Sequence, residues 1–214
     1  MEYSLTIAFE DFIPVALSAL GFAWVARRLS QRNVAASQLA WLGVALIVAG
    51  GFAKAFWKLI IAVSGADVTW LANSLFPLMA PGFLCLAWAL WHGLKAKARD
   101  TNVWLVPLAL SVVALGAAAF SAFSKGGRGW VLILLAATTL GNLFVSVQLI
   151  ADAWRRRLWW AAALFAYNLV TIFVQARLAR MEQTIALQWV EQINNTLSWA
   201  AFAAAAYLWQ REKQ

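Results

Sequence analysis

Residues 37–62 read SQLAWLGVALIVAGGFAKAFWKLIIA, and this stretch decides the class of fold. It is long enough to cross a membrane, since a helix that spans the hydrocarbon core needs about 20 mostly apolar residues. Its only charged residues are Lys54 and Lys58, which are four positions apart and therefore share one face of the predicted helix. A charged side chain at the centre of a span costs at least ~2.5–3.5 kcal/mol, so the two lysines also point to a functional site.

The rest of the chain has the same character. Of its 214 residues, 64% are hydrophobic and only 12% are charged, whereas soluble domains have about 45–50% apolar and about 25% charged residues. This composition predicts an all-α membrane protein and excludes a disordered chain or a disulfide scaffold. Cys85 and His92 are the only cysteine and the only histidine, so a zinc or haem site built from paired histidines is excluded and we expect no cofactor.

Seven stretches have the length and composition of membrane spans. Short polar or basic breaks separate them, so we expect a single seven-helix bundle over residues 1–214 and no soluble domain. The stretches are 4–26, 37–62, 69–91, 103–124, 129–153, 158–180 and 184–209.

Lysines and arginines predict the orientation of these spans. Eleven follow spans one, three and five or lie in the C-terminal tail, and four lie on the opposite side. Because the cytoplasmic side carries the excess, we expect the N-terminus outside and the C-terminus in the cytoplasm. The net charge of +8 then reflects topology and not nucleic-acid binding. We expect an integral multi-pass protein of a bacterial inner membrane, with the lipid bilayer as its first partner.

Two local similarities suggest an internal repeat. An Ala-Trp pair followed by Arg-Arg-Leu occurs within residues 23–29 and again within 153–158, and Trp41 and Trp70 have counterparts 119 residues later. These matches predict two parallel three-helix repeats, 1–92 and 129–214, joined by a linker helix over 103–124. The alternative is that helices rich in alanine and tryptophan match each other by chance.

Polar residues inside the spans mark a candidate site. Phe12 to Ala26 is too short to cross alone, so Glu10 and Asp11 must lie in the outer part of span one. Glu191 and Asn195 share one face of span seven, also toward the outer side, and span three carries Asn73. We predict an outward-facing polar cavity in which the acids face the two lysines. Its ligand-binding candidates are Asp11, Lys54, Lys58, Asn73, Glu191 and Asn195; the alternative is structural ion pairs and interhelical amide hydrogen bonds.

These features favour some functions over others. Lysines in a polar cavity suit a transporter or receptor for a small ligand with an anionic group. An accessory or assembly subunit of a membrane complex, or a homo-oligomer, would instead use a small-residue face such as 116–119. A membrane enzyme is disfavoured, because the chain has no Asp-rich motif and a single histidine.

Two families have a similar layout. Glu191, followed by Asn194 and Asn195, resembles the pattern of microbial rhodopsins, in which an acid precedes the retinal-binding lysine by four residues. Asn195 stands in place of that lysine and cannot form a Schiff base, and the Arg-Asp-Trp-Thr pattern is absent from 68–92, so the resemblance implies a retinal-free, opsin-like sensory protein. A three-one-three arrangement is similar to SWEET and PQ-loop transporters, although their Pro-Gln dipeptide is absent here.

Overall fold

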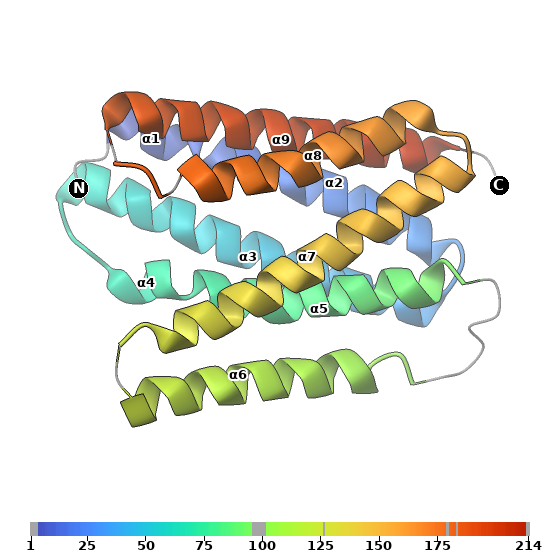
Figure 1. The fold of residues 1–214 in the computed structure, drawn as a ribbon, viewed down its shortest axis with the longest axis horizontal. Helices are drawn as coiled ribbons and strands as arrows, with labels where there is room; N and C mark the ends of the chain where they lie inside the picture. Colours follow the sequence, from blue (N-terminus) through green and yellow to red (C-terminus); the bar gives the residue numbers. More distant parts are fainter. Residues whose placement is uncertain (1–3, 96–101, 126, 179, 183, 213–214) are drawn as a thin grey trace. The chain divides into compact units, whose positions relative to one another are not determined.

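The computed structural model describes residues 4–95, 102–125, 127–178, 180–182 and 184–212. Within these ranges the chain forms nine helices and no strand (Figure 1), which confirms the prediction of an all-α protein. The helices are α1 (Leu5–Glu10), α2 (Phe12–Ser30), α3 (Val34–Ser64), α4 (Thr69–Asn73), α5 (Leu75–Gly93), α6 (Leu105–Lys125), α7 (Gly129–Arg155), α8 (Trp159–Leu178) and α9 (Ile185–Arg211).

Six helical segments are long and apolar enough to cross a membrane, which identifies an integral multi-pass membrane protein. They are Leu5–Ser30, Val34–Ser64, Thr69–Gly93, Leu105–Ser124, Gly129–Arg155 and Trp159–Leu178. Helix α9 has 27 residues, but Glu191 and several amides make it more polar than these six. The predicted count of seven spans and their orientation therefore stay predictions.

Two of the spans are interrupted at matching positions. Helix α1 ends at Glu10, four residues before Pro14, and α4 ends at Asn73, four residues before Pro77. Proline has no N–H to donate to the carbonyl four residues earlier, and its ring clashes with that carbonyl. The breaks at Asp11 and Ser74 follow from these prolines, and the sequence analysis had treated both spans as continuous.

The chain divides into two compact units. The first comprises Met1–Val25, Phe52–Ala72 and Leu149–Gln214, and the second comprises Ala26–Gly51 and Asn73–Gln148. Helices α2, α3, α4 and α7 each contain residues of both units. This division is not that of the predicted repeats, 1–92 and 129–214, which stay a prediction.

In the first unit, α9 packs against both α8 and the α1–α2 segment. Gly21 and Phe22 contact Phe202, and Trp24 contacts Tyr207 further along, so α2 and α9 run in the same direction. The contacts with α8 run the opposite way: Phe165 meets Phe202, whereas Asn168 and Thr171 meet Ser198. Helix α9 is therefore parallel to α2 and antiparallel to α8 over most of its length.

In the second unit, glycines bring α3 and α5 into close contact. A Cβ atom on Gly43 would lie 2.7 Å from the carbonyl oxygen of Gly82, and one on Gly82 would lie 2.8 Å from Ile47. Helices α5 and α6 pack side by side. Ala80 of α5, Ala118 of α6 and Leu134 of α7 form a small buried cluster. Small residues at helix contacts are typical of membrane bundles, in which close backbone approach replaces the hydrophobic effect.

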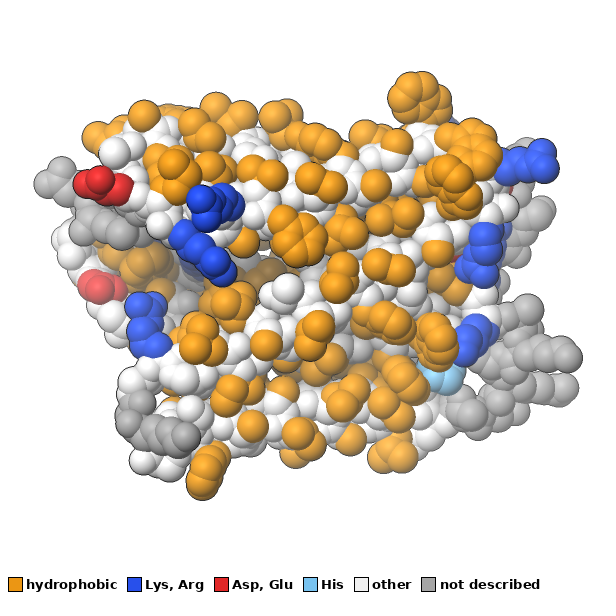
Figure 2. All heavy atoms as spheres, in the orientation of Figure 1, with side chains coloured by type: hydrophobic (Ala, Val, Ile, Leu, Met, Phe, Trp, Pro, Cys, Tyr) orange, Lys and Arg blue, Asp and Glu red, His pale blue; other side chains and the backbone are white. Residues whose placement is uncertain are grey.

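The surface fits a lipid environment. On the face drawn in Figure 2, hydrophobic side chains run along the helices, and Lys, Arg, Asp and Glu side chains lie toward the helix ends. Arg28, near the end of α2, is an exception because its side chain is buried, with a residue exposure of 2%. It was predicted to be one of the loop residues that set the topology.

Candidate functional site

An ion pair between α3 and the α1–α2 junction forms the centre of the candidate site. The Nζ atom of Lys58 lies 2.5 Å from Oδ2 of Asp11, and both side chains are largely buried, with exposures of 14% and 13%. Gln192 of α9 donates to Oδ1 of Asp11 at 2.5 Å. The carboxylate of Asp11 thus links the α1–α2 segment to α3 and α9. Asp11 lies at the break between α1 and α2.

Glu10 makes a second link to α9. The hydroxyl of Thr196 donates to one carboxylate oxygen of Glu10, and the other oxygen, Oε2, is buried and has no hydrogen-bond partner among the described residues. Because Thr196 follows Gln192 by four positions, the two acids of span one dock on the same face of α9.

Lys54 lies beside this cluster. It precedes Lys58 by one helical turn on the same face of α3, and the charges of Asp11 and Glu191 act on its ammonium. The residue has exposed surface, but protein surrounds its ammonium group. It forms no ion pair with any residue that the structure describes.

One face of α9 supplies the remaining polar groups. Gln188, Glu191, Gln192, Asn195 and Thr196 follow the helical spacing of three and four residues and so lie on one stripe. The amide oxygen of Gln188 is buried without a hydrogen-bond partner in the described part of the chain. Gln188 was not among the predicted ligand-binding residues, and its buried oxygen adds it to the candidate site.

The cluster lies near one end of the first unit. Lys58 is six residues before the end of α3, and Glu191 is six residues after the start of α9. At 1.5 Å per residue, each is about 9 Å from its helix end.

Asn73 and Asn195 stand apart from these contacts. Asn73 is the last residue of α4 and belongs to the second unit, with an exposed side chain. Asn195 is half-buried on α9 and makes no side-chain hydrogen bond within the described ranges. Of the six predicted site residues, Asp11 and Lys58 are in direct contact, and Lys54 and Glu191 are within electrostatic range of each other.

A separate polar ladder joins α8 to α9. Asn168 donates to Ser198 at 2.8 Å, Thr171 shares the same hydroxyl at 2.5 Å, and Asn194 donates to Gln175 at 2.9 Å. These groups satisfy one another, so the ladder is a structural interhelical network of the kind that the sequence analysis gave as the alternative to a site.

Asp152 is a buried charge that sequence reasoning did not single out. Its Oδ2 accepts from Arg156 at 2.6 Å and from the fully buried Trp209 at 2.9 Å, and Arg156 also approaches Glu212 at 3.5 Å. Burial alone would lower the pKa of Arg156, but the hydrogen bonds and charges of Asp152 and Glu212 outweigh it and raise that pKa. The four-residue spacing of Asp152 and Arg156 was the available signal, and the cluster anchors the end of α9 to α7.

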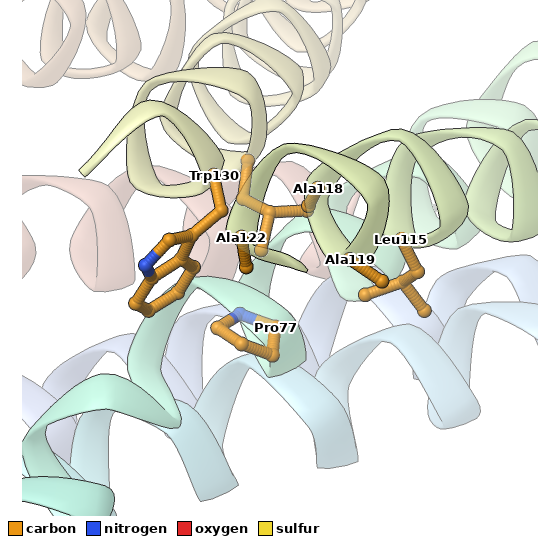
Figure 3. Close-up of a pocket in the computed structure, with 7 residues that line it drawn as sticks. Pro77, Leu115, Ala118, Ala119, Ala122 and Trp130 are labelled. Atoms are coloured by element: carbon orange, nitrogen blue, oxygen red, sulfur yellow. The ribbon is translucent and has the colours of Figure 1, made fainter. Parts of the chain in front are cut away.

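A groove in the second unit has a different character. Pro77 of α5, Ala118, Ala119 and Ala122 of α6, and Trp130 of α7 surround about 210 Å³ of almost entirely apolar space (Figure 3). It contains none of the predicted ligand-binding residues. Among the described residues, no group of three or more His, Cys, Asp or Glu side chains is placed to hold a metal ion.

Comparisons with protein-family models, with curated proteins and with solved structures give no match to this chain.

Proposed function

We propose that the protein is a seven-span membrane protein with its N-terminus outside and its C-terminus in the cytoplasm. Two observations support α9 as the seventh span: it lies parallel to α2, and it is antiparallel to α8 over the same length. Its polar side chains pair with the neighbouring helices, which reduces the cost of placing them in a membrane. The distribution of Lys and Arg supports the orientation. A bacterial inner membrane stays the expected location.

The function that the site supports best is the binding or transport of a small molecule that carries an anionic group. The observation behind this proposal is the difference between the two lysines. Asp11 neutralises Lys58, whereas Lys54, one turn away, lies beside the cluster without an ion pair to any described residue. An anionic group bound at Lys54 would offset the cost of keeping this ammonium inside a span.

A purely structural role for this cluster explains the Asp11–Lys58 pair but not the presence of Lys54. The Asp11–Lys58 pair and its bond from Gln192 would hold α2, α3 and α9 together without any ligand. Lys54 adds a second positive charge on the same face, and like charges four residues apart on a helix repel. Such a residue weakens the bundle unless a ligand uses it. We propose a non-enzymatic role, because the chain has no Asp-rich motif and a single histidine.

The accessory role is the second candidate, and the exposure of α6 favours it. Phe120 and Phe123 have exposures of 71% and 92%, and a Cβ added to Gly116 would have no atom within 4 Å. The groove beside Ala119 and Ala122 is also apolar. A transmembrane helix of another subunit, or of a second copy of this chain, could pack on this exposed apolar face.

Mass spectrometry of the gently purified protein, kept in its native state, separates the two candidates. We expect the wild type to retain a small molecule with an anionic group, and Lys54→Gln to lose it. Lys95→Gln is the matched control, because Lys95 is an exposed lysine at the end of α5, stacked on Trp91. Identical small molecules in all three proteins, or none in any, would refute binding at Lys54. A second polypeptide at fixed stoichiometry would favour the accessory role.

A further inference from the structure

The turn that joins α7 to α8 (Figure 1) carries three exposed tryptophans. Trp154, Trp159 and Trp160 have exposures of 61%, 51% and 80%. The first two are in contact across the turn, with ring centroids 4.5 Å apart. Because one apolar span ends at this turn and the next begins there, the three indoles lie where the hydrocarbon core meets the lipid headgroups.

The same turn carries three consecutive arginines, which differ in their contacts. Arg156 is held by Asp152 at 2.6 Å and approaches Glu212 at 3.5 Å. Arg155 is mostly exposed and lies 3.6 Å from Asp152. Arg157 is exposed and forms no ion pair with any residue that the structure describes. The two carboxylates are thus engaged with Arg156, and positive charge remains at the surface of the turn.

The backbone of Arg157 adopts a conformation that favours glycine. Its φ of 61° is the only positive φ of a non-glycine residue in the described part of the chain. Its N–H donates to the carbonyl of Trp154, and the N–H of Leu158 donates to that of Ala153, both at 3.0 Å, which is the Schellman ending of a helix. Glycine is the usual residue at this position, because it has no Cβ. The turn itself does not require arginine, so a role of its side chain is the better explanation.

Independently of the site around Lys54, we propose that this turn binds an anionic phospholipid. The phosphate of the lipid binds the guanidinium groups of Arg155 and Arg157. These residues are two positions apart, so their Cα atoms lie within about 7 Å of each other. Guanidinium binds phosphate through paired, charge-assisted hydrogen bonds. The indoles of Trp154 and Trp159 lie beside the glycerol and upper acyl region of the same lipid.

Charge and depth favour this occupant over others. A zwitterionic lipid has the same phosphate, but its ammonium group would meet the same arginines, and like charges repel. A soluble acidic protein would complement the arginines, but it would have to displace lipid to reach indoles at the ends of two apolar spans. An anionic lipid complements both the charge and the apolar surface. With the proposed orientation, it belongs to the cytoplasmic leaflet.

Thermal unfolding of the full-length protein in detergent micelles with added phospholipid tests this site. Dioleoyl phosphatidylglycerol and dioleoyl phosphatidylcholine have the same acyl chains and differ in net charge. A ligand that binds only the folded state raises the unfolding midpoint. We expect phosphatidylglycerol to raise the midpoint more than phosphatidylcholine does. Inorganic phosphate at the same concentration lacks the acyl chains and should leave the midpoint unchanged.

Arg157→Gly separates a lipid site from a structural role. Without lipid, we expect this variant to unfold at a higher temperature than the wild type, because glycine adopts a positive φ without strain. With lipid, it should lose most of the extra shift that phosphatidylglycerol gives. Arg155→Gln is a second variant at the same phosphate and should also reduce this shift. Arg180→Gln is the matched control, because it removes an exposed arginine between α8 and α9, and it should respond as the wild type does.

Two results would overturn the lipid site. In the first, the wild type responds equally to the two lipids, as it also would if the turn bound a soluble protein. In the second, Arg157→Gly keeps the full shift, or Arg180→Gln loses as much of it, because the effect then follows the total charge of the chain and not this turn. Neither result bears on the proposed function, since Lys54 lies on a different helix, α3.

Discussion

Asp11 and Asp152 are both acids inside membrane helices, and each is held by a cation and by a neutral donor. Asp11 has Lys58 and Gln192, and Asp152 has Arg156 and Trp209. The difference lies in what surrounds them. Asp152 pairs with the exposed Arg155 at 3.6 Å as well as with Arg156 at 2.6 Å, whereas Lys54 beside Asp11 forms no ion pair with any described residue. We therefore assign Asp152 to stability and Asp11 to the site.

Asp152→Asn tests this assignment at the level of one residue. The variant loses the negative charge that Arg156 and Trp209 share, and we expect the free energy of unfolding to fall by about 1.5–3 kcal/mol. Asp67→Asn is the matched control, because Asp67 also accepts from an indole, that of Trp57 at 2.8 Å, but is exposed. Its cost should stay within about 0.5 kcal/mol. Thermal unfolding followed by tryptophan fluorescence measures both, and equal losses would contradict the assignment.

Helix pairs in this protein are held by two different means. Side-chain hydrogen bonds to Ser198 link α8 and α9. Close backbone contact at Gly43 and Gly82 links α3 and α5. Hydrogen bonds fix the register of the first pair, because Asn168 and Thr171 of α8 both donate to the hydroxyl of Ser198. Glycines fix the distance of the second, since any side chain would force the helices apart.

Gly43→Ala tests the close contact of α3 with α5. The new methyl group would meet the carbonyl oxygen of Gly82, which is backbone and cannot rotate away, so we expect a loss of about 1–3 kcal/mol from overpacking. Gly116→Ala in α6 adds the same atom where nothing lies within 4 Å, and it should be neutral or slightly stabilising. The measurement is the unfolding midpoint of both variants, and an unchanged midpoint for Gly43→Ala would exclude a tight contact.

The crossing of α9 decides the topology of the whole molecule. We expect Ser64→Cys and Glu182→Cys to react with a membrane-impermeant maleimide from one side, and Ser30→Cys and Arg211→Cys from the other. The background is Cys85→Ala, which removes the only native, buried thiol. If α9 does not cross, the cysteines at positions 182 and 211 will be labelled from the same side, and the count will be six spans.

Much of this architecture could be predicted from residue types in order along the chain. Apolar length indicated membrane helices, and the prediction of an all-α membrane protein is confirmed. The candidate set of charged residues also followed from the sequence, because a charge inside an apolar run is visible without coordinates. The assignment of Asn73 to the same cavity depended on packing and stays a prediction.

Only the tertiary structure showed which charged and polar side chains contact one another. The sequence placed Asp11, Lys54, Lys58 and Glu191 at similar depth, because depth follows from helix rise along each span. It did not decide which lysine Asp11 neutralises, that one buried oxygen of Glu10 has no donor among the described residues, or that Asp152 accepts from Trp209. Those outcomes depend on how the helices are rotated and spaced, and that is set by contacts between residues up to 186 positions apart in the chain.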